Sequence, residues 1–220
     1  MEKVIVLRSL FAIFLTAAIV PRIIQKIKKV ETVGCIGINK KLFFLGKLSL
    51  VTSFVLIHVQ LGFVNLSLFA KNDAFFWICV ALLGTGVMLF TLAILSLGTF
   101  SLRVGLPQEN TSLHTSGVYR FSRNPMLLGL YLMALGSAIY VQNPMNWMLV
   151  IIALAVHHKI ILAEEDFFHE RFGDQWIEYR NRVRRYIYNL RSWLSRAVIS
   201  PHTLCFRLPA LVPNAINRQD

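Results

Sequence analysis

Residues 126–162 read MLLGLYLMALGSAIYVQNPMNWMLVIIALAVHHKIIL, two apolar runs on either side of a short polar break. The runs are Met126–Val141 and Trp147–Leu162, and only Gln142–Asn146 separates them. The break contains an Asn-Pro pair, and both residues favour turns. The stretch therefore predicts a helical hairpin.

Three further apolar stretches precede the hairpin: Val4–Val20, Leu42–Val64 and Ala74–Leu97. About 20 residues cross roughly 30 Å of hydrocarbon, so the second and third stretches are long enough to span a membrane. The first stretch has the start of a signal peptide, but no clear small-residue cleavage site follows it. We expect it to be kept as a membrane helix, which gives about five membrane helices in all.

The composition agrees with a membrane protein. The chain has 220 residues, of which 55% are hydrophobic and 15% charged, against about 25% charged residues in a soluble domain. The mean hydropathy is +0.57. These values exclude an ordinary soluble domain and a disordered chain. The three cysteines have no C-x-x-C spacing, so neither a zinc site nor a disulfide framework is expected. The predicted fold class is an all-α, polytopic membrane protein.

The formal net charge of +12 would suggest nucleic acid as a partner of a soluble protein. Here the basic residues flank the apolar runs, and membrane topology and anionic lipids explain them better. They are frequent before the second helix, between the third and fourth and after the fifth, and rare elsewhere. The positive-inside rule then puts the N-terminus outside and the C-terminus in the cytoplasm. Gly98–Asn124 and the region after Leu162 share the cytoplasmic face, where we expect any site for a soluble ligand.

The segment from Glu164 to about Leu190 predicts a cytoplasmic amphipathic helix, with Gly173 as an interruption. One side of this segment carries a stripe of aromatic and apolar residues. Two interpretations stay open: the helix lies in the membrane interface, or its stripe packs on the transmembrane helices. We expect one transmembrane domain over residues 1–190, its cofactor part at about 98–190, and a tail over 191–220. The stripe recurs every three or four residues: Phe168, Phe172, Trp176, Tyr179, Val183 and Ile187.

The loop Thr111–Pro125 reads TSLHTSGVYRFSRNP and opens the hairpin. Gly117 allows a positive φ or a close backbone approach, and Pro125 suits the first turn of a helix. The free N–H groups of that turn, with Arg123 just before it, suit an anion such as a carboxylate. The alternative is a plain capped loop in which Arg120 and Arg123 are positive-inside anchors.

The Glu164-Glu165 pair is expected to end the fifth helix. Acidic residues are unusual at a cytoplasmic membrane boundary, and carboxylates there are functional candidates. The alternative is a solvated helix end, which the helix dipole disfavours. The six histidines form no H-x-x-H-H cluster, so we expect no metal. We interpret His157 and His158, and also His58 and Gln60, as polar residues that pack between helices.

Placed together, three pieces resemble a known family. They are SGVYRFSRNPMLLG (116–129), the E-E pair after the hairpin, and RFGDQWIEYRNRV (171–183). The combination looks like the isoprenylcysteine carboxyl methyltransferase and phospholipid methyltransferase superfamily of integral membrane proteins. The resemblance covers about Ser112–Ile187.

The resemblance implies an S-adenosylmethionine site formed by the loop before the hairpin and the E-E segment after it. It implies catalytic roles for Arg123 and Glu165. The cofactor-binding residues that it implies, together with those that the loop itself suggests, are Ser112, Leu113, His114, Gly117, Tyr119, Asn124, Pro125 and Glu164.

The chain departs from the family pattern in ways that bear on the acceptor. Thr111 stands where prenylcysteine enzymes have His, and Asn124 replaces the His of R-H-P. Asn can donate a hydrogen bond but cannot carry a proton at neutral pH. Leu127 replaces a family Tyr, and Ile160 lies where prenylcysteine enzymes place a substrate-binding Arg.

The predicted function is methyl transfer from S-adenosylmethionine to a lipid-like or prenylated amphiphile in the bilayer, with the active site facing the cytoplasm. A carboxylate acceptor needs no base, whereas a phospholipid amine must first lose a proton. The nearby candidate bases are Glu165 and His158, and neither is an obvious dedicated base, which favours a carboxylate. The alternatives are a phospholipid amine methyltransferase, a membrane reductase with a nicotinamide cofactor, and a non-catalytic lipid-binding or scaffold protein.

Overall fold

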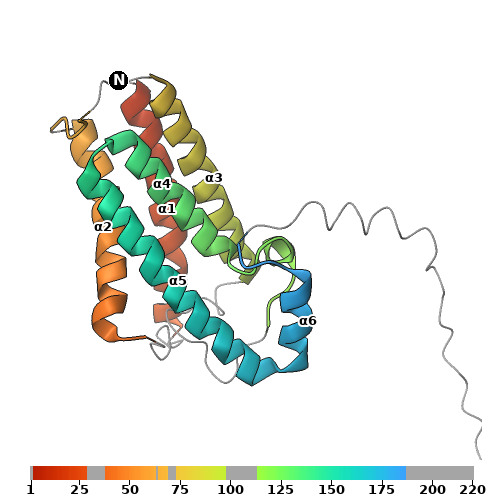
Figure 1. The fold of residues 1–220 in the computed structure, drawn as a ribbon. Helices are drawn as coiled ribbons and strands as arrows, with labels where there is room; N and C mark the ends of the chain where they lie inside the picture. Colours follow the sequence, from red (N-terminus) through yellow and green to blue (C-terminus); the bar gives the residue numbers. More distant parts are fainter. Residues whose placement is uncertain (1, 29–37, 63, 69–72, 98–112, 187–220) are drawn as a thin grey trace, which may run out of the picture. The chain divides into compact units, whose positions relative to one another are not determined.

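The computed structural model describes residues 2–28, 38–62, 64–68, 73–97 and 113–186, all within the compact unit Met1–Tyr188. Ser112, Ile187 and the tail 191–220 lie outside these ranges. The described residues form helices and no strand. In chain order the elements are α1 (Glu2–Ile27), α2 (Lys40–Gly62), α3 (Asp73–Leu97), the 3-10 turn η1 (Gly117–Arg120), α4 (Pro125–Val141), α5 (Pro144–Phe172) and α6 (Asp174–Arg182) (Figure 1).

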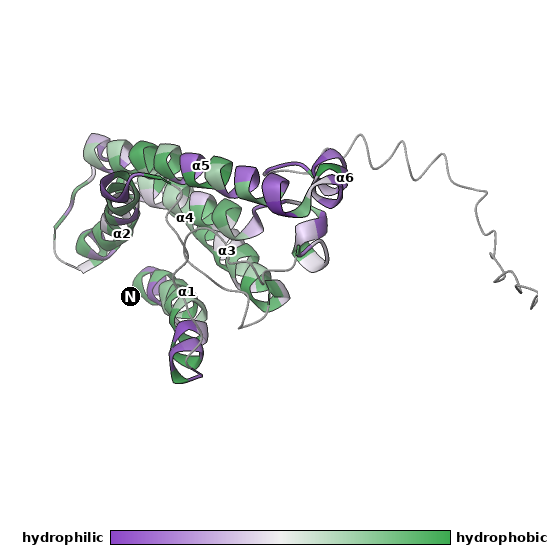
Figure 2. Ribbon diagram, turned by 90° about the horizontal axis from the view of Figure 1, so that it is seen from below, coloured by the Kyte–Doolittle hydropathy of each residue, from purple (hydrophilic) through white to green (hydrophobic). Residues whose placement is uncertain are grey.

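Four of these helices, α1, α2, α3 and α5, are long and apolar enough to cross a membrane, and α4 is a shorter apolar helix. Figure 2 shows hydrophobic residues along them and hydrophilic ones on α6 and the adjoining end of α5. Large apolar side chains point outward: Leu95 is 70% exposed, Leu48 66% and Ile151 63%. Apolar surface of this extent suits lipid rather than water. The prediction of an all-α, polytopic membrane protein is confirmed.

The predicted hairpin is the α4–α5 pair. Gln142 ends α4 in the left-handed region with a φ of 50°, and its N–H donates to the Ala138 carbonyl. The Asn143 side chain then accepts a 2.9 Å hydrogen bond from the backbone N–H of Met145 and caps α5. Pro144 is the first residue of α5, where a missing N–H costs nothing.

The closest helix contact is between α3 and α4. Gly86 and Gly129 face each other so tightly that a Cβ on either would lie 2.6 Å from the other's carbonyl oxygen. Small residues at a membrane helix crossing let the two backbones approach and gain van der Waals contact. The start of α4, which carries the predicted site, is therefore held against α3.

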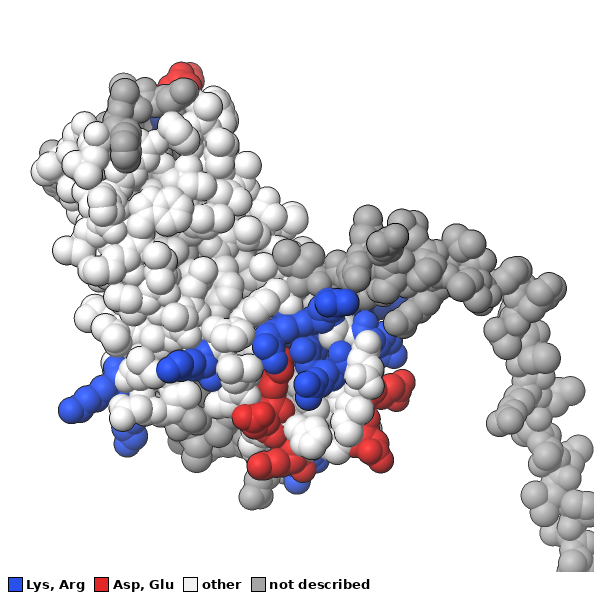
Figure 3. Space-filling model, in the orientation of Figure 1, with Lys and Arg blue, Asp and Glu red and all other residues white. Residues whose placement is uncertain are grey.

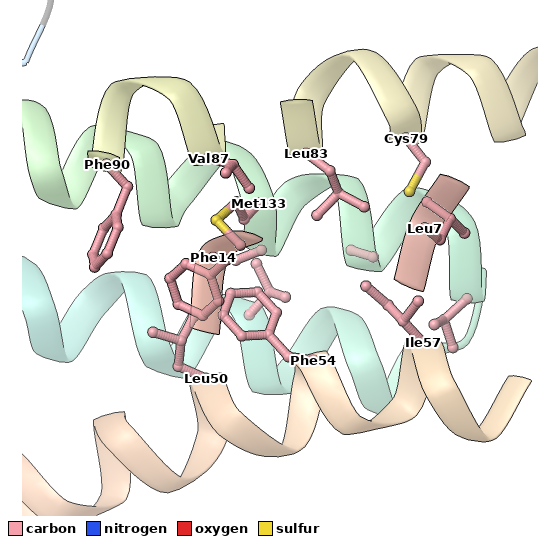
Figure 4. Packing of buried hydrophobic residues seen from close by; sticks show 14 of the residues in the cluster. Leu7, Phe14, Leu50, Phe54, Ile57, Cys79, Leu83, Val87, Phe90 and Met133 are labelled. Atoms are coloured by element: carbon pink, nitrogen blue, oxygen red, sulfur yellow. The ribbon is translucent and has the colours of Figure 1, made fainter. Parts of the chain in front are cut away.

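Side chains from α1 to α4 fill the centre of the bundle, as Figure 4 shows. The Phe14 ring lies 5.7 Å from that of Phe54 and 5.0 Å from that of Phe90, in edge-to-face pairs. Met133 of α4 is 1% exposed within the same cluster. These contacts place α1 against α2 and α3.

Polar residues in this core bond between helices. The Gln60 amide donates a 3.2 Å hydrogen bond to the Tyr140 carbonyl on α4, as predicted. His58 instead bonds within its own helix, with Nδ1 3.1 Å from the Phe54 carbonyl. Its ring packs on the Phe11 ring of α1, with the ring centres 4.4 Å apart and the planes tilted by 57°.

The predicted end of the fifth helix is wrong. The helix does not stop near Leu162 with Glu164-Glu165 at its end, because α5 continues to Phe172. Glu165 is buried, and Phe168 and Phe172 pack against a second apolar cluster, so one face of the extension stays inside the protein. Gly173, with a φ of 49°, ends α5 and confirms the predicted interruption.

The aromatic stripe after Glu164 is not one amphipathic helix. It divides between the end of α5, the short α6 and an extended Val183. Trp176, Tyr179 and Val183 are 2 to 3% exposed, and Phe168, Phe172 and Leu113 pack against them. The described residues of the stripe pack against one another and against Leu113 in a cluster of their own. Neither a helix lying in the membrane interface nor a stripe packed on the transmembrane bundle is confirmed.

Candidate functional site

The two polar segments that the sequence analysis placed on one face do meet. The segment from Leu113 to Asn124 and the chain after α5 lie at the same end of the bundle (Figure 1). Figure 3 shows Lys, Arg, Asp and Glu gathered at that end, while most of the remaining visible surface carries no charge. The candidate site is built where these segments touch.

Backbone and side-chain hydrogen bonds join the two segments. The N–H of Arg123 donates 3.0 Å to the carbonyl of Arg184. The Ser122 hydroxyl and the Asn124 amide donate to the carbonyl of Arg185 at 3.2 and 3.3 Å. These bonds fix the residues just before α4 against the chain that follows α6.

Tyr179 makes a further link from inside the aromatic cluster. Its hydroxyl donates a 2.8 Å hydrogen bond to the backbone carbonyl of Tyr119. Burial raises the pKa of both phenols, so both stay neutral and able to donate at physiological pH. Tyr179 and Glu164 raise the pKa of Tyr119 further.

The centre of the site is the carboxylate of Glu165, which lies between two guanidinium groups. Arg185 donates to it from Nε at 2.9 Å and from Nη2 at 2.7 Å, a bidentate geometry that makes a strong pair. Nη2 of Arg123 lies 3.3 Å from Oε1 of Glu165, and these two side chains are only 7% and 9% exposed. The guanidinium carbon of Arg123 lies 5.3 Å from the centre of the Trp176 ring, within cation–π range.

Three buried donors in this cluster have no acceptor among the described residues. They are Nε and Nη1 of Arg123 and Nε1 of Trp176. A buried donor left unpaired costs about 1–3 kcal/mol, and more when it is charged. Burial lowers the pKa of the Arg123 guanidinium and the nearby Glu165 carboxylate opposes that shift, but an arginine remains a cation at neutral pH. The donor set therefore fits an anion with several acceptor atoms, such as a carboxylate.

The loop geometry matches two expectations. Gly117 has a φ of 59°, and a Cβ there would lie 2.7 Å from the Ser96 hydroxyl of α3, so only glycine fits. Pro125 is the first residue of α4. Leu113 packs against the aromatic cluster and His114 is half-buried, so of the loop residues predicted to bind the cofactor only Ser112 lies outside the described ranges.

The candidate bases are already engaged. Both oxygens of Glu165 accept hydrogen bonds from Arg185, and Nδ1 of His158 bonds to the hydroxyl of Tyr186. Nδ1 of His157 lies 2.7 Å from the Ala153 carbonyl of its own helix. In the described parts of the chain, no three His, Cys, Asp or Glu side chains come together as metal ligands would.

Sequence reasoning missed three residues of this cluster. The sequence explains the basic residues after the fifth helix, Arg185 among them, by membrane topology and places Trp176 in the aromatic stripe, and it indicates no role for Ser122. A signal for Arg185 existed: two adjacent acidic residues at a membrane boundary need a counter-charge, and the basic pair Arg184-Arg185, near the end of the stripe, could supply it.

Known proteins resemble parts of this chain. A family model described as phospholipid methyltransferase matches residues 74–175, from α3 into α6. Protein-S-isoprenylcysteine O-methyltransferase of Saccharomyces cerevisiae is 35% identical over 69 residues, which are 31% of this chain and 29% of the yeast protein. An uncharacterized protein of Haemophilus influenzae is 33% identical over 63 residues, 28% of this chain and the whole of that protein. The match thus spans less than a third of the yeast relative's length.

Proposed function

Because this chain belongs to the superfamily of membrane methyltransferases that includes phospholipid and isoprenylcysteine methyltransferases, we propose that it transfers a methyl group from S-adenosylmethionine to a membrane-embedded amphiphile. The family membership and the membrane helices support an integral membrane methyltransferase. The cofactor, the acceptor and the orientation in the membrane belong to the proposal.

One observation carries the cofactor assignment. The Arg123 side chain is 7% exposed, is held by Glu165 on one side, and has two buried nitrogens without an acceptor in the described structure. The α-carboxylate of S-adenosylmethionine has the charge and the two acceptor oxygens that this guanidinium lacks. The N–H of Trp176, whose ring centre lies 5.3 Å from the guanidinium carbon of Arg123, is a third buried donor without an acceptor in the described structure.

The remaining site residues surround this anchor. Tyr119, Glu164 and the backbone of 112–114 would hold the rest of the cofactor, and Asn124 and Gly117 would shape the loop. S-adenosylmethionine supplies an already activated methyl group on a sulfonium, so the protein mainly orients two reactants and excludes water. Glu165 is a positioning residue in this proposal, because it holds Arg123 and Arg185.

The same geometry favours a carboxylate as the acceptor. An amine would need a group to take its proton, and both Glu165 and His158 are hydrogen-bonded to other side chains. A carboxylate is already ionised at neutral pH and can attack the methyl group without losing a proton. With the N-terminus outside, the site faces the cytoplasm, where the soluble cofactor is available.

The test is transfer of a labelled methyl group. Purified protein in detergent is incubated with methyl-labelled S-adenosylmethionine and a total membrane lipid extract, beside Glu164→Gln and the exposed neighbour Asp166→Asn as matched control. We expect label in the lipid phase with the wild type and the control and at least tenfold less with Glu164→Gln. Label that alkali releases as methanol identifies an ester, and alkali-stable label identifies an amine acceptor. No label in lipid from well-folded wild type would contradict the proposal.

A further inference from the structure

A cavity of about 260 Å³ lies inside the bundle among α1, α2, α3, α4 and α5. Its walls are mainly apolar and aromatic, as at Phe14, Leu50, Phe90 and Leu130. The volume is just below the range of about 300–1,000 Å³ typical of small-ligand pockets. It suits one alkyl or prenyl chain rather than a whole two-chain lipid.

Part of the lining is basic. Arg22 of α1 and Lys47 of α2 both line the cavity, together with the polar side chains of Gln25 and His157. No Asp or Glu is among the described residues that form its walls. Arg22 is exposed and Lys47 is half-buried, and the Lys47 ammonium lies 4.3 Å from the centre of the Phe43 ring. An ionisable residue within a membrane helix commonly marks a substrate path.

The two cations differ from the neighbouring Lys26 in lining the cavity. Lys47 is seven residues inside the start of α2 and Arg22 five residues inside the end of α1, so both lie roughly 8–10 Å within their helices at 1.5 Å per residue. Arg22 and Lys26 are both exposed, but only Arg22 lines the cavity. Lys26 has the features of an ordinary positive-inside anchor.

The cavity is next to the candidate site. Met126 and Leu130, in the first turns of α4, line it, and Arg123 lies just before that helix. The start of α2 and the end of α1 lie at the same end of the bundle as α6 (Figure 1). An amphiphile in the cavity would have its charged end toward the residues proposed to hold the methyl donor.

We propose that Arg22 and Lys47 select the acceptor by holding the carboxylate of a single-chain amphiphile whose apolar chain fills this cavity. The proposal rests on the proposed function for its chemistry, but it concerns helices outside residues 74–175, which the phospholipid methyltransferase model matches. The recognition chemistry is charge complementarity between two cations and one carboxylate.

The methyl transfer that follows is balanced without a further reactant. One carboxylate oxygen supplies an electron pair and forms the new O–CH3 bond. The S–CH3 bond breaks and its electron pair stays on sulfur, so the sulfonium becomes a neutral thioether and the carboxylate a neutral ester. No proton is released, which agrees with the engagement of Glu165 and His158 elsewhere.

A direct binding experiment tests the selection without the cofactor. Photoactivatable dodecanoate, which carries a diazirine in its chain, is crosslinked to the purified protein in detergent, beside dodecylamine with the same diazirine. We expect crosslinks on cavity residues of α1 or α2 with the carboxylate probe, and at least tenfold fewer with the amine. In the double variant Arg22→Gln/Lys47→Met, the number of crosslinks with the carboxylate probe should fall about tenfold or more, since hydrogen bonds to charged groups are strong. Lys26→Gln should behave as the wild type, and Arg22→Lys should retain most of the crosslinking.

The outcomes separate the two proposals. S-adenosylhomocysteine binding by the double variant should match the wild type, which also shows that the variant is folded. Equal crosslinking by the two probes, or carboxylate crosslinks unchanged in the folded double variant, would overturn the role of Arg22 and Lys47. Selective carboxylate crosslinking by a wild type that binds no S-adenosylhomocysteine would support this role while contradicting the proposed methyl transfer.

Discussion

Arg185 donates two hydrogen bonds to Glu165, of 2.9 and 2.7 Å, across 20 residues of sequence. This ion pair joins the chain that follows α6 to the extension of α5. The same carboxylate lies 3.3 Å from Arg123, so one acidic side chain orders both cations. Glu165 lies in the part of α5 beyond Leu162. This extension places the Glu165 carboxylate next to Arg123, in the loop before α4.

Removing the charge of Glu165 should lower the free energy of unfolding. Glu165→Gln leaves the buried Arg123 guanidinium without its ion-pair partner and weakens the bidentate bond to Arg185. Breaking a buried pair by removing one partner costs about 3–5 kcal/mol, and we expect a loss of about 3 kcal/mol because Arg185 is partly exposed. Denaturant-induced unfolding in detergent measures it.

Glu178→Gln is the matched control for that variant. Its carboxylate is 81% exposed and lies 4.0 Å from Arg182 one turn along α6. Exposed pairs of this kind contribute about 0–1 kcal/mol, so Glu178→Gln should unfold within that margin of the wild type. Equal losses for the two variants would show that Glu165 has no special structural role.

The Gly86–Gly129 contact predicts a position-specific effect of one methyl group. In Gly129→Ala the new Cβ would lie 2.6 Å from the Gly86 carbonyl oxygen, so α3 and α4 must separate, at a cost of about 1–3 kcal/mol. Gly84→Ala on α3 has no atom within 4 Å of the new Cβ and should be neutral or stabilise the helix by up to about 1 kcal/mol. Thermal unfolding of both variants checks this, and equal behaviour would contradict the tight crossing.

Tyr179 makes a prediction about pH. Burial raises the pKa of its phenol above the ordinary value, so above pH of about 10 the unfolded chain loses this proton first and stability falls as the pH rises. Tyr179→Phe should cost about 1–2 kcal/mol at neutral pH, through the lost bond to the Tyr119 carbonyl. It should also reduce the fall in stability between pH 9 and 11, measured by unfolding at each pH. A variant with the same alkaline slope as the wild type would count against a buried Tyr179 phenol.

Much of the fold could be predicted because, in a membrane, the local sequence determines where helices form. Apolar runs long enough to span the bilayer must become helices, and the Asn143-Pro144 turn and Pro125 start were visible as single residues. The end of α5 could not be predicted, because Glu164-Glu165 looks like a polar boundary until its partners are known. Those partners, Arg123 and Arg185, come from distant segments.

The same reason limits the prediction of the site. Arg123, Glu165 and the loop around Gly117 follow from motif and resemblance. The contact of Trp176 with Arg123 does not, because a stripe at helical spacing carries no information about which surface it covers. The cavity beside Arg22 and Lys47 depends on packing among five helices, which no single segment specifies.

Calorimetric titration of the detergent-solubilised protein with S-adenosylhomocysteine tests the central claim most directly, beside Arg123→Gln and Arg120→Gln. Arg120 is exposed on η1 and serves as the matched control. The account predicts micromolar binding by the wild type and by Arg120→Gln. It predicts at least tenfold weaker binding by Arg123→Gln, since a charge-assisted bond of about 1.5–3 kcal/mol is lost. A folded wild type that does not bind, or an Arg123→Gln variant that binds as tightly as the wild type, would contradict the account.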